Sequence, residues 1–320
     1  MKLVTDFPFT HEEVQQILAA GEGQVDVVLC KDRAEFLEKV SEAEVIYGAP
    51  DTEVLARAAR LRWVQAAAAG VEALAELMRS HPAALTNQAV SFAPAISETA
   101  LGMLIALARG INRWYVPQFR ARKWEPVGTT KSHHHAEISG RVMGIAGFGG
   151  IGQALARRAH YGFDMKILAI DSRALHKPPF VAELRDPSWL MEMVAQSDVL
   201  VAAAPHTAET DKMFNETVFR AMKKTAYFLA LSRGKLFDDL ALVKALKEGW
   251  IAGAGLDVFP QEPIPAEHPI FDCPNVVMTM HTSGWSPDRQ VRLMALFTEN
   301  VRRYTRGLPL LNLVDKERGY

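Results

Sequence analysis

Cysteine is almost missing from this 320-residue chain, which has only Cys30 and Cys273. A small disulfide-stapled domain needs several cysteines, and a cysteine-based zinc site needs them in close pairs. The two residues lie in different halves of the sequence, so we expect neither a disulfide framework nor a metal site. Free thiols suit a reducing compartment, and the cytoplasm is therefore the expected location.

An excess of charge is missing as well, because 36 Lys and Arg residues nearly balance 37 Asp and Glu residues. Proteins that bind nucleic acid or an anionic membrane surface through their charge usually have a basic excess, so neither partner is expected. The N-terminus MKLVTDFPFTHEE turns acidic too early for a secretory signal. No apolar run approaches the roughly 18 residues of a membrane helix, and we expect no membrane span.

The sequence does contain many short apolar runs that alternate with amphipathic stretches. Its composition, 49% hydrophobic and 23% charged, is that of a globular protein, and its length allows two domains. The runs KLVTDF, VDVVLC, VIYGAP and WVQAAAAG in the first hundred residues are separated by helical patterns. This alternation predicts an α/β fold around a parallel sheet.

A long apolar segment separates this first series from a second one. Residues 97–124 show helical periodicity, and Ser97 is a suitable N-cap, so the pattern predicts one long helix. Six further runs follow from residue 141, namely RVMGIAG, MKILAID, DVLVAAA, TAYFLALS, AGAGLDV and NVVMTM. The helical stretch 288–307 has no further strands to cover, and we expect it to pack on the first domain. The predicted domains are therefore 1–97 plus 292–320, and 98–291.

A dinucleotide-binding fingerprint begins the second series. Gly147, Gly149 and Gly152 form G-x-G-x-x-G directly after an apolar strand and directly before an Ala-rich helical run. The first glycine permits a tight turn, the second allows close approach of a pyrophosphate, and the third allows the helix to pack on the strand. The helix N-terminus then faces the phosphates.

The next strand ends in Asp171, at the position where a carboxylate would bind the adenosine ribose of NAD. Basic residues follow it at Arg173, His176 and Lys177, and these side chains could bind the 2′-phosphate of NADP instead. The sequence thus favours NAD and leaves NADP open.

Three ionisable residues follow apolar runs of the second series, where the carboxyl ends of parallel strands meet and ligands bind. Arg233 follows TAYFLALS, Glu262 follows AGAGLDVFPQ, and His281 follows NVVMTM. Arg233 would bind a carboxylate and polarise a carbonyl with its fixed donor geometry. His281 would exchange a proton with the carbonyl oxygen, and Glu262 would orient the imidazole and favour its protonated form. The set suits reduction of a 2-oxo acid.

The segments GFGGIG, HTAETDKMFNE and LSRGKLFDDLALVKALKEGWIAGAGLDVFPQEPIPAEHPIFDCPNVVMTMHTSG resemble the D-isomer-specific 2-hydroxyacid dehydrogenase family. The resemblance covers essentially the whole chain. It implies a Rossmann dinucleotide-binding domain inserted in a flavodoxin-like substrate domain, and a homodimer. It also implies an enzyme that interconverts a small 2-oxo acid, such as glyoxylate or hydroxypyruvate, and its D-2-hydroxy acid. Arg233, Glu262 and His281 fall on the family's catalytic positions.

The resemblance also implies the residues that contact cofactor and substrate. The loop AAAAGVEAL would bind the substrate carboxylate through backbone amides at Ala69, Gly70 and Val71, together with Arg233 and His281. Asp257 would hold the nicotinamide carboxamide. The implied cofactor-binding positions are Thr99, Gly147, Phe148, Gly149, Gly150, Ile151, Gly152, Asp171, Ser172, Arg173, Ala204, Pro205, Thr210, Leu231, Ser232, Asp257, His281 and Ser283.

Several features stay open. Trp285 could cap the substrate side chain or pack against the C-terminal helix. Trp114 and Trp124 fall where the family has its dimer interface, although core packing would also explain them. Three consecutive residues, His133–His135, cannot all face one ion comfortably, so no metal is predicted there. An alternative function is that of an NAD(H)-sensing interaction protein like the C-terminal-binding-protein corepressors, which share this fold.

Overall fold

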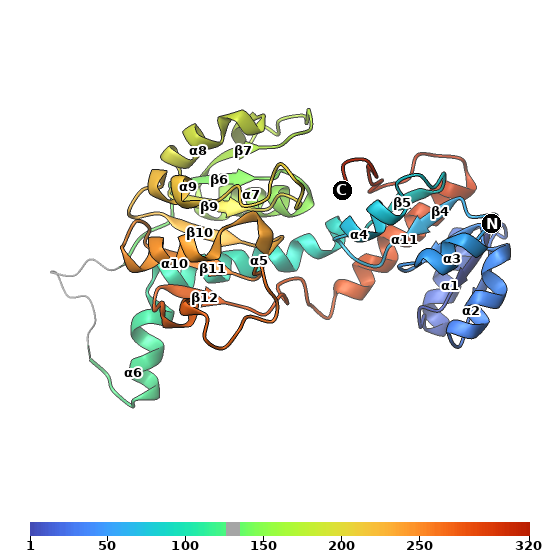
Figure 1. Cartoon of the computed structure of the whole chain (residues 1–320), viewed down its shortest axis with the longest axis horizontal. Coiled ribbons are helices and arrows are strands. Elements are labelled where there is room, and N and C mark those ends of the chain that lie inside the picture. Colours follow the sequence, from blue (N-terminus) through green and yellow to red (C-terminus); the bar gives the residue numbers. More distant parts are fainter. Residues whose placement is uncertain (126–134) are drawn as a thin grey trace. The chain divides into compact units, whose positions relative to one another are not determined.

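The computed structural model describes residues 1–125 and 135–320 (Figure 1). His133 and His134, at which we predicted no metal, lie outside the described residues. The chain divides into two compact units. Residues Met1–Phe92 and Ser286–Tyr320 form the first unit, and Ala93–Trp285 form the second. The boundaries expected from sequence lie a few residues C-terminal to these.

The first unit contains a five-stranded parallel sheet in the order β2-β1-β3-β4-β5, which is the flavodoxin-like order. The sequence did not predict β5, which is only three residues long and follows His81 and Pro82. Short helices connect the strands. The elements are β1 (Lys2–Thr5), α1 (His11–Ala20), β2 (Asp26–Leu29), α2 (Arg33–Lys39), β3 (Val45–Tyr47), α3 (Thr52–Arg57), β4 (Trp63–Gln65), α4 (Glu72–Leu77) and β5 (Ala84–Thr86).

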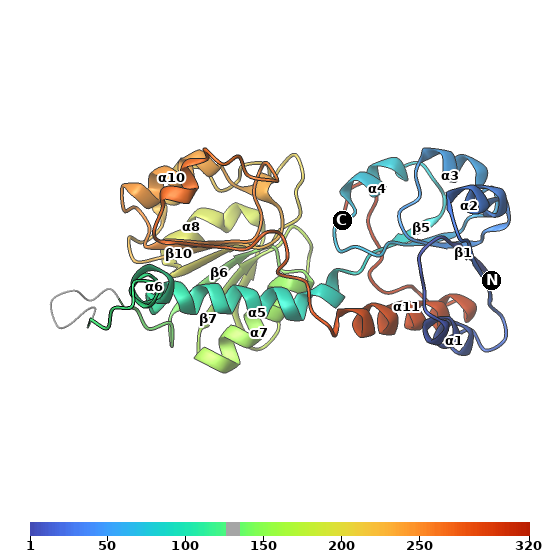
Figure 2. The ribbon, with the colours of Figure 1, turned by 90° about the horizontal axis from the view of Figure 1, so that it is seen from below.

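The second unit contains a seven-stranded parallel sheet in the order β12-β11-β10-β9-β6-β7-β8, a Rossmann arrangement with one added strand at the β12 edge. Helices α8 and α10 lie on one face, and α7 lies on the other (Figure 2). The predicted α/β fold with two parallel sheets is confirmed. The elements are β6 (Val142–Ala146), α7 (Gly150–Phe163), β7 (Lys166–Ile170), β8 (Val181–Arg185), α8 (Leu190–Gln196), β9 (Val199–Ala202), α9 (Glu216–Ala221), β10 (Tyr227–Ala230), α10 (Asp239–Lys247), β11 (Gly253–Leu256) and β12 (Val276–Met278).

The sequence predicted six strands here and missed β8. This strand lies at the sheet edge, and only Val181 of its five residues is buried. Its sequence VAELR therefore lacks the continuous apolar run of the central strands, such as the fully buried β9. An edge strand needs less apolar surface than a central one, which explains the omission.

The long helix α5 (Ala89–Ala108) begins earlier than predicted. Ser97 is not its N-cap, because this residue lies inside the helix and its hydroxyl donates to the Pro94 carbonyl at 2.8 Å. Asn87 does the capping instead, since its side-chain oxygen accepts a hydrogen bond from the Ala89 amide at 3.2 Å. The helix also ends earlier, before Gly110, whose φ of 64° reverses the backbone.

A π-helical turn (Ile111–Tyr115) and α6 (Val116–Arg120) follow α5. The expectation that no segment matches a membrane span needs correction for α5. By length and composition this helix could cross a membrane, with a mean hydropathy of 1.6. Half of that window is buried inside the protein, as in the core helix of a soluble protein, so its composition is weak support for a membrane span.

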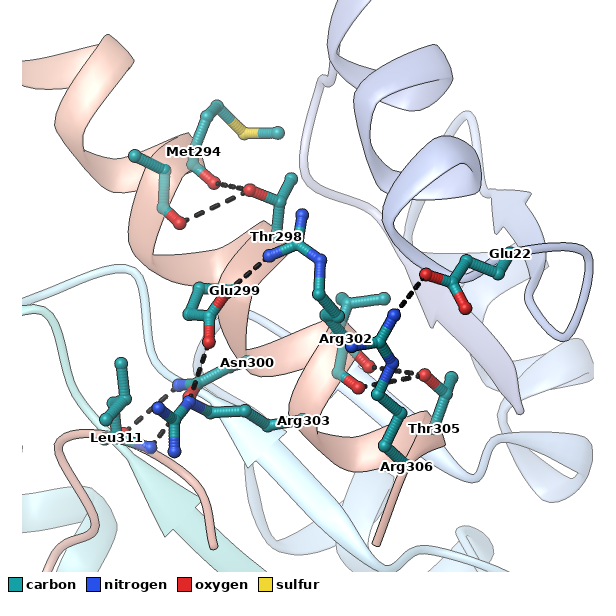
Figure 3. A network of polar contacts seen from close by, with 12 residues as sticks. Glu22, Met294, Thr298, Glu299, Asn300, Arg302, Arg303, Thr305, Arg306 and Leu311 are labelled. Carbon is teal, nitrogen blue, oxygen red and sulfur yellow. Dashed lines mark hydrogen bonds and ion pairs between the residues drawn. The ribbon is translucent and has the colours of Figure 1, made fainter. Parts of the chain in front are cut away.

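Helix α11 (Arg289–Thr305) belongs to the first unit and packs on α1. Its Phe297 ring lies 4.6 Å from that of Tyr47 in the buried core. Asn300 is fully buried and exchanges two hydrogen bonds with the backbone of Leu311 (Figure 3). Arg306 near the end of the helix pairs with Glu22. The C-terminal segment thus completes the core of the first unit.

Candidate functional site

The glycine turn after β6 has the geometry that a dinucleotide requires. Gly147 has a φ of 95°, and a Cβ atom there would lie 2.5 Å from the Cα of Ala204. A Cβ at Gly152 would collide with the Gly147 carbonyl, so α7 can pack this closely only with glycine. Helix α7 begins at Gly150, with Gly149 at its N-cap. Phe148 lies in the turn and Ile151 in the first turn of α7, and the amides at this helix N-terminus suit a phosphate.

Asp171 directly follows β7, and its side chain is 7% exposed. Its carboxylate accepts hydrogen bonds from the Phe148 amide at 2.8 Å and from the amide and guanidinium of Arg173 at 2.9–3.1 Å. Burial opposes the charge of Asp171, but the hydrogen bonds from Arg173 and Phe148 outweigh it and lower the pKa. The carboxylate is therefore charged, and it is linked directly to the glycine turn.

The ends of β9 and β10 are tied together beside this turn. The Leu231 amide donates to the Ala202 carbonyl at 3.2 Å, and the Ser232 hydroxyl donates to the Ala204 carbonyl at 2.8 Å. The Thr210 hydroxyl donates to the Pro205 carbonyl at 2.8 Å, which closes the following loop. These predicted cofactor positions thus lie at the carboxyl edge of the sheet.

The structure brings His281 and Glu262 together at the same edge. His281 Nδ1 lies 2.8 Å from Glu262 Oε2, and Glu262 Oε1 accepts a hydrogen bond from the Phe259 amide at 2.8 Å. The imidazole is half exposed. Within residues 1–125 and 135–320, no group is hydrogen-bonded to its Nε2. One ring nitrogen is therefore fixed by a carboxylate, and the other can meet a reactant.

Asp257 holds the loop that carries His281. This residue is 2% exposed, and its Oδ1 accepts hydrogen bonds from the Thr279 hydroxyl at 2.6 Å and from the amides of Thr282 and Ser283 at 3.0 and 3.1 Å. Its Oδ2 accepts from the Ser283 hydroxyl, and its carbonyl accepts from the His281 amide at 2.8 Å. Sequence reasoning assigned Asp257 only to the nicotinamide and missed this role. The segment Thr279–Ser283 lies far from Asp257 in the sequence, so no local pattern signals this contact.

Arg233 follows β10, and its loop is joined to the segment that carries Glu262. The guanidinium is partly buried and donates to the Ser232 carbonyl at 2.7 Å. A Cβ atom at Gly234 would overlap the Phe259 carbonyl, so only glycine permits this close approach. Gly234 was not predicted as a site residue, although the dipeptide Arg-Gly at a strand end is a local signal for it. Thr99 on α5 lies beside the His281 loop, because its hydroxyl donates to the Ser283 carbonyl at 3.3 Å.

The loop Ala66–Val71 of the first unit ends in three consecutive residues, Ala69, Gly70 and Val71, whose backbone amides could bind a ligand. The carbonyls of Ala68 and Ala69 accept hydrogen bonds from Gln88 and Asn87, at 2.9 and 3.1 Å. The amides of Ala69, Gly70 and Val71 donate to none of the residues that the structure describes. Consecutive unpaired amides of this kind suit an anion.

Several aromatic side chains are exposed. Trp285 is 70% exposed, and Trp124 is 88% exposed with its ring stacked on that of Phe119 at 6.2 Å. Trp114 is partly buried and lies against Gly110. In the described part of the chain, no group of three or more His, Cys, Asp or Glu residues could hold a metal ion.

The chain is similar to known proteins over most of its length. Residues 101–283 match the family model described as D-isomer specific 2-hydroxyacid dehydrogenase, NAD binding domain. The chain is 35% identical to a glyoxylate reductase of Korarchaeum cryptofilum, over 96% of this chain and 95% of that protein. It is 36% identical to a glyoxylate reductase of Pyrococcus furiosus, over 89% of this chain and 86% of that protein.

Two solved structures show the same fold. A D-isomer specific 2-hydroxyacid dehydrogenase family protein from Aeromonas salmonicida has a TM-score of 0.80 and 28% identity, and the match covers 98% of this chain and 99% of that one. An NADPH-dependent glyoxylate/hydroxypyruvate reductase from Sinorhizobium meliloti, in complex with NADP and sulfate, has a TM-score of 0.81 and 25% identity. That match covers 100% of this chain and 99% of the other.

Proposed function

Because the chain belongs to the D-isomer specific 2-hydroxyacid dehydrogenase family, we propose that His281, Glu262 and Arg233 catalyse its reaction. The protein is an NAD(P)-dependent oxidoreductase that transfers a hydride between a nicotinamide cofactor and a 2-oxo or 2-hydroxy acid. An NAD(H)-sensing interaction protein is not favoured. The observation that supports these roles is the hydrogen bond between His281 and Glu262. The pair lies at the carboxyl edge of the seven-stranded sheet, as does the glycine turn.

The proton transfer follows from this pair. Gly147–Gly152 and Asp171 would hold a nicotinamide cofactor, which would supply the hydride for the carbonyl carbon. His281, with Glu262 on its Nδ1, gives the proton on Nε2 to the carbonyl oxygen. Glu262 fixes the orientation of the imidazole, since one of its oxygens accepts the Nδ1 hydrogen bond and the other is anchored to the Phe259 amide. In the oxidation direction, Nε2 takes the proton back from the hydroxyl.

The substrate's carboxylate needs donors of its own. We propose that the amides of Ala69, Gly70 and Val71 bind it together with Arg233. The unpaired state of these amides and the permanent charge of the guanidinium support this assignment. Trp285 is proposed to contact the substrate side chain, since its indole is largely exposed beside the His281 loop. We propose glyoxylate, hydroxypyruvate or a close relative as the substrate, because the similar proteins are named for these acids.

The preferred cofactor is proposed to be NAD. The charged carboxylate of Asp171 would accept hydrogen bonds from the ribose hydroxyls and would repel a 2′-phosphate. Arg173, which is bonded to that carboxylate, would lessen the repulsion, so NADP is expected to bind more weakly rather than not at all. The structural relative from Sinorhizobium meliloti is in complex with NADP, which supports NADP as a second cofactor of this chain.

We also propose a cytoplasmic homodimer. Both cysteines are buried and unpaired, which suits a reducing compartment. The exposed stack of Phe119 and Trp124 would be covered in a dimer, because large aromatic side chains are enriched at such interfaces. Sedimentation of the wild type and of a Trp124→Glu variant tests this. A wild type that sediments as a monomer at micromolar concentration would refute the dimer.

A panel of 2-oxo acids, each assayed with NADH and with NADPH, tests the proposed substrate and cofactor. We expect turnover of glyoxylate or hydroxypyruvate and a higher kcat/KM for NADH. Formation of the L-2-hydroxy acid, or turnover restricted to substrates without a carboxylate, would contradict the proposal.

A further inference from the structure

The loop Ala66–Val71 is held by the two residues that follow β5. The Gln88 amide donates to the Ala68 carbonyl at 2.9 Å, and the Asn87 side-chain amide donates to the Ala69 carbonyl at 3.1 Å. Both hydrogen bonds act on carbonyl oxygens of the loop. They therefore determine which way two successive peptide groups face.

Peptide geometry carries this effect to the neighbouring amides. In a trans peptide, the carbonyl and the next N–H point in opposite directions. The bond from Asn87 to the Ala69 carbonyl therefore turns the N–H of Gly70 away from Asn87. The bond from Gln88 turns the N–H of Ala69 in the same way. Neither amide donates to any residue in the described ranges, so both can bind an anion.

The side chain of Asn87 has a defined orientation. Its Oδ1 accepts hydrogen bonds from the Ala89 amide at 3.2 Å and from Asn312 Nδ2 at 3.3 Å. The Asn87 amide donates to the Asn312 carbonyl at 3.1 Å, and the Asn87 carbonyl accepts from Gln65 Nε2 at 3.3 Å. If the side-chain amide of Asn87 were flipped, its NH2 group would face two other donors, the Ala89 amide and Asn312 Nδ2. Nδ2 of Asn87 must therefore face the Ala69 carbonyl.

The wider polar network supports the same arrangement. Gln65 is fully buried, and its Oε1 accepts hydrogen bonds from the Thr86 hydroxyl at 2.9 Å and from Asn300 Nδ2 at 3.1 Å. Asn300 in turn binds the backbone of Leu311 (Figure 3). Strands β4 and β5, helix α11 and the C-terminal segment thus all fix the position of Asn87.

We propose that Asn87 is a positioning residue that orients the Gly70 amide toward the carboxylate of the substrate. This rests on the proposed function, in which the amides of Ala69, Gly70 and Val71 bind that carboxylate. Asn87 does not touch the substrate and acts through the Ala69 peptide. Its loss weakens recognition of the carboxylate and leaves proton transfer by His281 intact.

Two variants test this role. Asn87→Ala removes the donor to Ala69. Asn87→Asp keeps the shape of the side chain but replaces the donor with an oxygen that repels the Ala69 carbonyl. We expect KM for glyoxylate to rise about tenfold in both variants, as for the loss of one hydrogen bond to a charged group. We expect kcat and the dissociation constant of NADH to stay within about twofold of the wild type.

The decisive readout is the ratio of kcat/KM for glyoxylate to kcat/KM for its uncharged methyl ester. A loop that is merely less stable would lower both values together, whereas a misdirected amide lowers the ratio by about tenfold. Asn275→Ala is the matched control, because its side-chain amide also donates to a backbone carbonyl, that of Ala252 at 3.2 Å, but in the second unit. We expect this control to leave the ratio unchanged.

The outcomes separate this proposal from the one on which it rests. If both Asn87 variants keep the wild-type value of the ratio of kcat/KM for glyoxylate to kcat/KM for the ester, the positioning role is overturned. The proposed function is unaffected by that result. An equal loss of kcat/KM for the acid and the ester also overturns the positioning role. A wild type that reduces no 2-oxo acid overturns the proposed function, and the positioning role with it.

Discussion

His281 Nδ1 and Glu262 Oε2 lie 2.8 Å apart, and the other oxygen of the same carboxylate accepts a hydrogen bond from the Phe259 amide, also at 2.8 Å. The carboxylate is thus held by the backbone on one side and holds the imidazole on the other. This relationship leaves Nε2 as the ring nitrogen that can exchange a proton with a reactant.

His281→Gln should lower kcat for 2-oxo acid reduction by about 10²- to 10⁴-fold, because the proton donor is removed. Glu262→Gln keeps a hydrogen-bond partner but loses one of the two acceptor oxygens that link the imidazole to the Phe259 amide, and we expect a smaller loss of about tenfold or more. Steady-state kinetics measure both effects, and NADH titration should show unchanged affinity. Full activity of His281→Gln would refute its role.

Asp257→Ala should destabilise the protein, because the hydroxyl of Thr279 and the amides of Thr282 and Ser283 would lose their buried acceptor. We expect the free energy of unfolding to fall by about 3 kcal/mol, with kcat falling as well because the loop of His281 is released. Asp257→Asn keeps one oxygen and should lose only about 1 kcal/mol. Urea unfolding and kinetics on the same samples check this, and an Ala variant with unchanged kcat would contradict it.

Asp171→Ala should shift cofactor preference toward NADPH. The substitution removes the charge that repels a 2′-phosphate and releases the guanidinium of Arg173. We expect the ratio of kcat/KM for NADPH to that for NADH to rise about tenfold or more. The double variant with Arg173→Ala is the control, since it should lose most of the gain in NADPH use. An unchanged ratio in the single variant would argue against the carboxylate as selector.

The same carboxylate predicts a pH dependence of stability. Burial opposes its charge, but its hydrogen bonds prevail and the pKa of Asp171 is lowered on folding. A group of this kind stabilises the folded state above its unfolded pKa of about 3.9, and the contribution is lost as pH falls through the folded value. The difference in unfolding free energy between the wild type and Asp171→Asn should be constant above about pH 5 and should shrink below about pH 4. Urea titrations across this range measure it.

Gly147, in the turn before α7, and Gly162, near the C-terminal end of α7, should respond in opposite ways to substitution by alanine. Gly147→Ala should cost about 2 kcal/mol or more and abolish cofactor binding, because of its φ of 95° and the nearby Ala204 backbone. Gly162→Ala should stabilise the protein by about 0.5–1 kcal/mol, since no heavy atom lies within 4 Å of the added Cβ in the helix. Thermal unfolding compares the two, and a stabilised Gly147→Ala would contradict this account of the turn.

The parts of the fold that could be predicted are those with a local signature. The strand, glycine turn and helix around Gly147 follow from periodicity and the need for a positive φ. The positions of Arg233, Glu262 and His281 could be predicted because each residue follows the end of an apolar run that marks a strand. Strands β5 and β8 could not be predicted in this way, because one has three residues and the other is mostly exposed at an edge.

The site features that sequence reasoning missed depend on contacts between distant segments. Asp257 reaches Thr279 and Ser283, and Asn87 reaches Ala69 and Asn312. No periodicity links such pairs, since tertiary packing alone brings them together. Ser97 illustrates the converse, because a local capping pattern was overridden by apolar residues upstream that extend α5.

The division of the first unit into two stretches of sequence has a consequence for biosynthesis. The second unit is continuous, so it can fold as soon as it leaves the ribosome, whereas Met1–Phe92 must wait for Ser286–Tyr320. At ordinary rates of translation, this delay is on the order of ten seconds or more. During that time β4 and β5 lack the covering helix α11 and the segment around Asn312. The segment Met1–Phe92, which is synthesised first, therefore belongs to the unit that completes its folding last.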